Sequence, residues 1–141
     1  AKPGQRVVVV GGKGTAIAVA LFLIHDFPGT RVAMVDPVKK FGHDVNPSYI
    51  WRYKMKLKEG GVVQMPRCQV KEIQEEELLV ETPEGELTIP CDTVVLADMQ
   101  PYKPFKVPVK EGREVYVVGD ALIARRGNSA IQDGYRLGMT L

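Results

Sequence analysis

The feature that most constrains the fold is a glycine-rich loop set between apolar runs near the amino terminus. The run Arg6–Val10 lacks the polar alternation of a strand with one face in water, so we expect a strand buried on both faces of a parallel sheet. The loop Gly11–Gly14 follows, and then Thr15–Asp26 predicts a mostly buried helix with Thr15 as a candidate cap. Arg31–Val35 predicts a second buried strand, which completes a βαβ unit.

The remainder of the chain predicts shorter elements. The first are a helix over Pro47–Glu59 capped by Asn46 and a strand over Val62–Met65. Three short strands follow, over Gln69–Ile73, Leu78–Glu81 and Leu87–Ile89. Next come buried strands over Asp92–Leu96 and Glu114–Val118, joined by an irregular connection over Pro101–Pro108, and then a terminal helix over about Asn128–Leu141. The three short strands are expected to form an antiparallel meander. We therefore predict an α/β fold with a Rossmann-like parallel sheet, flanked by helices, and a small antiparallel β-meander.

Length, charge and cysteine spacing narrow the class of protein. A chain of 141 residues predicts one domain, with a core over residues 1–100 and a return segment with a terminal helix over 101–141. The net charge of +2, with both signs interspersed, indicates neither a nucleic-acid nor a membrane partner. Thr15–Ile24 is too short to span a bilayer. Cys68 and Cys91 stand 23 residues apart and are expected to be buried, reduced thiols, so we predict a cytoplasmic protein.

The glycine loop is the first candidate binding site. A glycine-rich turn between a buried strand and a helix suits pyrophosphate, because its backbone can approach the ligand and the helix start offers free N–H groups. The candidate residues are Gly11, Gly12, Lys13, Gly14 and Thr15. Against the usual Gly-x-Gly-x-x-Gly spacing, one frame places Lys13 at the middle glycine and the other places Ile17 at the last. A loop that only turns the chain is the alternative.

Asp36 is the second candidate, because it ends the second predicted strand 25 residues after Gly11. A carboxylate about 20 residues after such a loop accepts hydrogen bonds from the adenosine ribose, which favours NAD over NADP. Lys39 and Lys40 follow closely and could neutralise a 2′-phosphate. A solvated carboxylate at a strand end is the alternative interpretation of Asp36.

Further segments, spread over almost the whole chain, resemble a known family. They are Val35-Asp36 followed by Phe41-Gly-His-Asp44, Trp51 before Leu57-Lys-Glu-Gly-Gly-Val62, Ile89-Pro-Cys-Asp-Thr-Val-Val-Leu-Ala97, and Val115-Tyr-Val-Val-Gly-Asp-Ala121 before Ala130-Ile-Gln-Asp-Gly-Tyr-Arg136. With the glycine loop, they resemble the carboxyl-terminal dinucleotide-binding region of the NADH:flavin oxidoreductase family, which includes 2,4-dienoyl-CoA reductase, 2-enoate reductase and trimethylamine dehydrogenase. The fold implied is the FAD/NAD(P)-binding ββα sandwich type.

The resemblance implies an NADH-binding domain that is not catalytically complete alone and carries no catalytic residue of its own. NAD(H) is the implied cofactor, and FAD or ADP is also compatible, with Gly119 and Asp120 approaching a bound FAD. FMN and an iron–sulfur cluster belong only to a larger parent protein. The implied partners are the dinucleotide, the remaining domains of that parent and, as an outside alternative, a second copy in a homodimer.

Two departures from the family pattern leave a second function open. Lys13 stands at a glycine position, and Asp98-Met99 replaces the usual Thr-Gly or Val-Gly after Val94–Ala97. The alternative is therefore a degenerate Rossmann-like module that serves assembly or binds ADP structurally. His25 and His43 have no carboxylate or cysteine placed as a metal site requires, so we predict no metal ligands.

Overall fold

The computed structural model describes residues 2–98, 112, 114–123 and 125–141. The chain divides into two compact units, Ala1–Asp98 and Met99–Leu141, which are described separately. None of the helices in these ranges is long and apolar enough to cross a membrane.

Within the described part of the first unit, four parallel strands form the central sheet, in the order β3-β2-β1-β7. The strands are β1 Arg6–Val10, β2 Arg31–Asp36, β3 Val63–Pro66 and β7 Thr93–Leu96. The chain proceeds from β1 outward through β2 to β3, and then returns to the other side of β1 as β7. The predicted α/β fold is confirmed, and the carboxyl ends of β1 and β7 mark the point where the strand order reverses.

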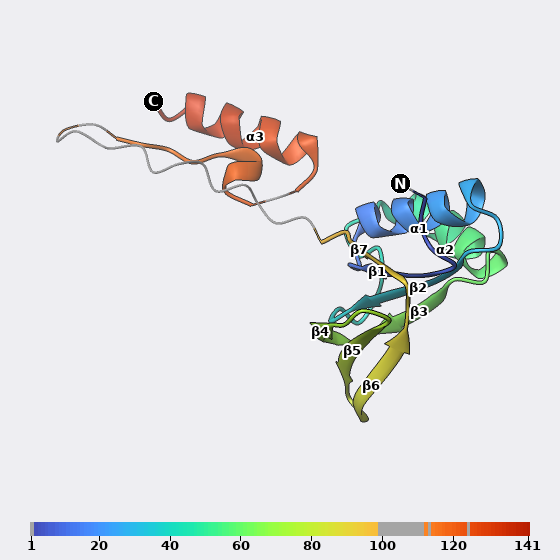
Figure 1. Ribbon diagram of the computed structural model, residues 1–141. Coiled ribbons are helices and arrows are strands. Elements are labelled where there is room, and N and C mark those ends of the chain that lie inside the picture. Colours follow the sequence, from blue (N-terminus) through green and yellow to red (C-terminus); the bar gives the residue numbers. More distant parts are fainter. Residues whose placement is uncertain (1, 99–111, 113, 124) are drawn as a thin grey trace. The chain divides into compact units, whose positions relative to one another are not determined.

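The unbroken valine run of β1 follows from the two layers that cover the sheet. Val7 and Val9 pack in a core under the helices, whereas Val8 packs in a second core under the meander. Figure 1 shows α1 (Gly14–Asp26) and α2 (Pro47–Glu59) on one face of the sheet and the meander on the other. Because both faces are covered, a polar residue at any of these positions would be buried.

The antiparallel meander is also confirmed. It consists of β4 Gln69–Ile73, β5 Glu77–Thr82 and β6 Gly85–Pro90, in that order. Leu78 and Val80 on the central strand are fully buried against the sheet. The meander therefore closes the face of the sheet that the helices leave open.

The two predicted helix caps have different outcomes. The Asn46 side chain accepts a hydrogen bond from the Ser48 N–H at 2.9 Å, as a cap of α2 should. Thr15 does not occupy the cap position of α1, because that helix begins one residue earlier, at Gly14, and Lys13 precedes it. The acceptor for the Gly14 N–H comes instead from Asp44, 30 residues along the chain.

The second unit contains the short 3₁₀ turn η1 (Gly119–Ala121) and the helix α3 (Gly127–Gly138). The predicted strand over Glu114–Val118 is wrong, since these residues form no strand. Their valines are 37–52% exposed, and no described residue offers them a ladder of backbone hydrogen bonds. The predicted connection Pro101–Pro108 lies outside the described residues.

Candidate functional site

The glycine loop lies where β1 passes into α1, at the reversal of strand order. The Gly11 N–H donates to the Val35 carbonyl oxygen at 2.9 Å, which ties the loop to β2. Gly11 has φ +141°, and a Cβ there would lie 3.0 Å from the Ala97 carbonyl carbon and oxygen. Glycine is therefore required for both the backbone conformation and the close approach of the chain that leaves β7.

The packing of Ala16 favours one of the two frames of the glycine motif. Ala16 is fully buried, and a Cβ on Gly11 would come within 3.2 Å of its methyl group. Ala16 thus fills the third position, where a small residue lets the helix pack closely on the strand. This frame places Lys13 at the middle position, where the backbone of a typical loop comes nearest to a pyrophosphate.

Asp36 lies directly beside the loop. A Cβ on Gly12 would be 2.8 Å from the Asp36 carboxyl carbon and 2.6 Å from a Val38 methyl group. The half-buried Asp36 carboxylate accepts a hydrogen bond from the Val38 N–H at 2.8 Å, which fixes the turn after β2. The structure therefore brings the glycine loop and Asp36 together at one edge of the sheet.

Asp44 is a part of this region that sequence reasoning did not single out. Its carboxylate accepts the Gly14 N–H at 2.9 Å, at the positive end of the α1 dipole. The Gly42 N–H donates to the Gly12 carbonyl at 2.6 Å, so the segment around it is bonded to the loop. The one sequence signal for this role was an aspartate in the loop after Asp36. It did not reveal the role, because Gly14 lies 30 residues earlier and only the fold brings the two residues together.

The two departures from the family pattern meet in space. The Lys13 ammonium lies 3.4 Å from an Asp98 carboxylate oxygen, and the two side chains are 40% and 45% exposed. Lys13 lies in the loop after β1, directly before α1, and Asp98 follows β7. This ion pair therefore spans the carboxyl ends of the two strands at which the strand order reverses.

Gly119 and Asp120, the remaining candidates, belong to the second unit, where η1 is bonded to α3 and to the residues just before it. The Gly119 N–H donates to the Asp133 carboxylate at 3.3 Å, and Arg125 forms an ion pair with the same carboxylate. An Asp120 carboxylate oxygen accepts the Arg125 N–H at 3.4 Å. Asp133 was missed as the residue that fixes this turn, although it stands in the quoted segment Ala130–Arg136.

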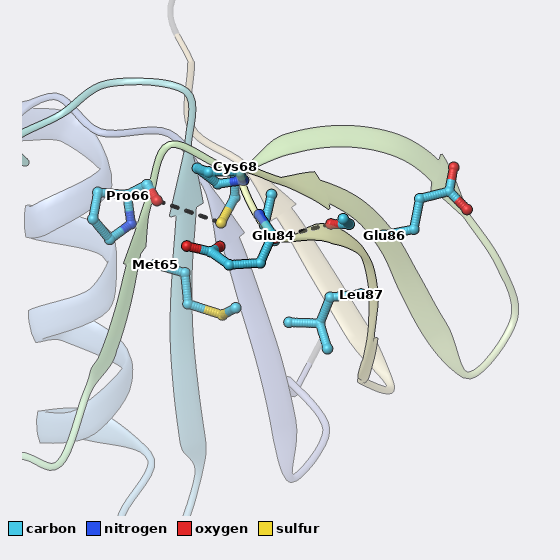
Figure 2. Close-up of a pocket in the computed structure, with 9 residues that line it drawn as sticks. Met65, Pro66, Cys68, Glu84, Glu86 and Leu87 are labelled. Carbon is cyan, nitrogen blue, oxygen red and sulfur yellow. Dashed lines mark hydrogen bonds between the residues drawn. The ribbon is translucent and has the colours of Figure 1, made fainter.

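A pocket beside the turn between β5 and β6 is lined by Cys68, whose side chain is itself buried. Figure 2 shows Cys68 beside Met65 and Glu84, with Leu87 at the opposite wall. Burial raises the pKa of the Cys68 thiol, and the Glu84 carboxylate raises it further. Burial likewise raises the pKa of Cys91. Both thiols are free, as predicted, and are poor nucleophiles at neutral pH.

Comparison with known proteins adds three relatives. A metal reductase from Desulforamulus reducens is 24% identical over 163 aligned residues, which cover 95% of this chain and 24% of that protein. A structure of 2-naphthoyl-CoA reductase in complex with 2-naphthoyl-CoA is 28% identical with a TM-score of 0.77, covering 100% of this chain and 22% of the other. The bacillithiol disulfide reductase of Bacillus cereus is 26% identical with a TM-score of 0.60, covering 68% of this chain and 29% of the other.

The chain thus spans between 22% and 29% of the length of these relatives. The family described as pyridine nucleotide-disulphide oxidoreductase matches residues 1–134. That match covers nearly the entire sequence, including the glycine loop and Asp36, and such domains bind FAD, NAD(P) or both. The chain belongs to the pyridine nucleotide-disulphide oxidoreductase family.

Proposed function

We propose that the chain is the NADH-binding domain of a flavin-dependent oxidoreductase of the NADH:flavin type. The observation that carries the proposal is the juxtaposition of the Gly11–Gly14 loop and Asp36 at the reversal of strand order, the place where open α/β sheets bind ligands. The chain is not complete as an enzyme, because the substrate would be reduced in another part of a longer protein.

The residues of this region fit an adenine dinucleotide. The pyrophosphate would lie over the start of α1, near Lys13, whose ammonium supplies positive charge. Asp36 would accept hydrogen bonds from the ribose hydroxyls and repel a 2′-phosphate, which favours NAD(H) over NADP(H). When bound, the nicotinamide supplies a hydride, and the part of this chain is to bind and orient the dinucleotide.

The remaining expectations depend on a longer parent protein. Gly119 and Asp120 would approach an FAD, and the η1 turn that holds them is fixed by Asp133. FMN and an iron–sulfur cluster would reside in other domains, which would be the partners of this chain. Which compound the parent reduces would be decided by those domains.

A second candidate function is a module that keeps the fold but binds no redox dinucleotide. Its support is the negative charge already present at the loop, where Asp44 accepts the Gly14 N–H and Asp98 pairs with Lys13. A carboxylate at the start of α1 accepts the backbone N–H hydrogen bond that a bound phosphate would accept there. Such a module would serve domain assembly or hold ADP as a structural ligand.

Replacing Asp36 by Asn separates the two candidates. The asparagine oxygen can still accept the Val38 N–H, so the turn is kept while the charge is lost. If the chain is an NADH domain, calorimetric titration should show that NADH binds the wild type and that Asp36→Asn weakens its binding about tenfold, or about 1.4 kcal/mol. NADPH should bind the wild type more weakly than NADH.

Asp26→Asn is the matched control, since Asp26 lies at the far end of α1 from the loop. It removes the same charge and should leave NADH affinity unchanged. A wild-type chain that binds ADP but neither NADH nor NADPH would favour the second candidate instead.

A further inference from the structure

The Lys13–Asp98 ion pair joins two distant parts of the chain at the edge of the proposed binding site. The ammonium and carboxylate approach to 3.4 Å although 85 residues separate them in sequence. Lys13 stands at the middle position of the loop, and Asp98 stands just beyond Ala97, whose carbonyl group touches the Gly11 position. The pair therefore lies at the edge where a pyrophosphate would arrive.

The charges around the loop make this pair important for binding. Apart from Lys13, the residues that contact the loop by side chain include the carboxylates of Asp36, Asp44 and Asp98. A pyrophosphate brings further negative charge, and Lys13 is the cation that the loop itself contributes. A ligand of this kind gains attraction from Lys13 only to the extent that the ammonium turns from Asp98 toward the phosphate.

We propose that Asp98 is an internal competitor for Lys13, and that the ion pair acts as a latch that a diphosphate must displace in order to bind. The inference rests on the proposed function and deepens it, because it names the residues that set the affinity for the diphosphate part of the ligand. Adenosine, which carries no phosphate, does not need to displace the latch.

The latch makes a quantitative prediction about Asp98→Asn. The pair is about half exposed, and releasing Lys13 from such a pair is expected to raise ADP affinity about fivefold. Adenosine affinity should not change. Both positions are exposed enough that the substitutions should leave the fold intact, which an unchanged amide spectrum would verify.

A double-mutant cycle separates the latch from simple repulsion between Asp98 and the ligand. ADP and adenosine are titrated by NMR into the 141-residue wild type, Asp98→Asn, Lys13→Met and the double variant. With Lys13 present, removal of the Asp98 charge should give the full gain in ADP affinity. With Met at position 13, only the relief of repulsion is left, and the gain should fall below about twofold. Asp26→Asn and Lys58→Met are the charge-matched controls and should change neither affinity.

Each other outcome contradicts a specific statement. Equal gains with and without Lys13 would show that Asp98 acts only as a like charge, and no gain would show that it does not oppose binding; either result overturns the latch while the proposed function stands. If neither wild type nor Asp98→Asn binds ADP, both the latch and the proposed function are wrong.

Discussion

Gly11→Ala should lower the free energy of unfolding of the first unit by about 2–5 kcal/mol. Two costs add at this position. The φ of +141° is a backbone conformation that L side chains rarely adopt, and the new methyl would meet the Ala97 carbonyl carbon and oxygen at 3.0 Å. The Ala97 N–H donates a hydrogen bond to the Val10 oxygen of β1, so moving this carbonyl away from the new methyl would strain that hydrogen bond.

Gly85→Ala is the matched control for the backbone part of this cost. Gly85 has a similar φ of +127°, but no atom lies within 4 Å of the position its Cβ would take. Urea unfolding followed by the fluorescence of Trp51, the single tryptophan, reports on the first unit, because Trp51 lies in α2. Equal losses for the two variants would show that the close approach of the Ala97 carbonyl adds no steric cost, and that the account of Gly11 is wrong.

Leu57→Ala should destabilise the same unit by about 2–5 kcal/mol. Leu57 is the one fully buried residue of α2, whose residues the structure describes in full, and it packs in the core that the helices share with the sheet. Its truncation leaves a cavity where α2 meets that core. The large expected effect arises because most of the other α2 side chains face solvent and hold the helix only weakly.

Met55→Ala serves as the control for Leu57→Ala. Met55 lies on the same helix with 46% of its surface exposed, so the same kind of truncation should cost about 0.5 kcal/mol or less. The two variants are compared by urea unfolding with the Trp51 signal. Similar losses at both positions would mean that α2 is held by its exposed face, contrary to the packing described above.

The parts of the fold that sequence could predict are those in which neighbouring residues carry the information. The valines of Arg6–Val10 indicate burial on both faces, and Asn46 before Pro47 defines the start of α2. The bounds of α2 and β4 agree with the prediction at both ends. Each of these signals combines a local pattern with a residue of strong conformational preference.

The two errors arose because the structure of a segment depends on more than its own residues. Glu114–Val118 has the composition of a buried strand, but a strand forms only when a neighbouring strand pairs with its backbone. Thr15 has a side chain suited to capping, yet Asp44 reaches the start of α1 from another loop. The sequence around Thr15 contained no information about Asp44, and the sequence of Glu114–Val118 did not reveal whether a partner strand would be present.

In the candidate site, too, the local signals could be predicted from the sequence and the tertiary contacts could not. The glycine loop and Asp36 were identified from spacing, and the structure brings them together. Lys13 and Asp98 were each recognised as departures from a pattern, but their pairing required β1 and β7 to lie side by side. Two unusual residues that stand 85 positions apart in sequence are therefore one electrostatic feature of the folded chain.

The most direct test of the central claim is to map where NADH contacts the chain, by recording amide ¹H–¹⁵N spectra as NADH is added. The account predicts that the largest shifts occur at Gly11, Gly12, Gly14 and Asp36, and that they saturate together. Shifts confined to the Cys68 and Glu84 pocket, or no shifts at all, would contradict the assignment of the dinucleotide site to the glycine loop.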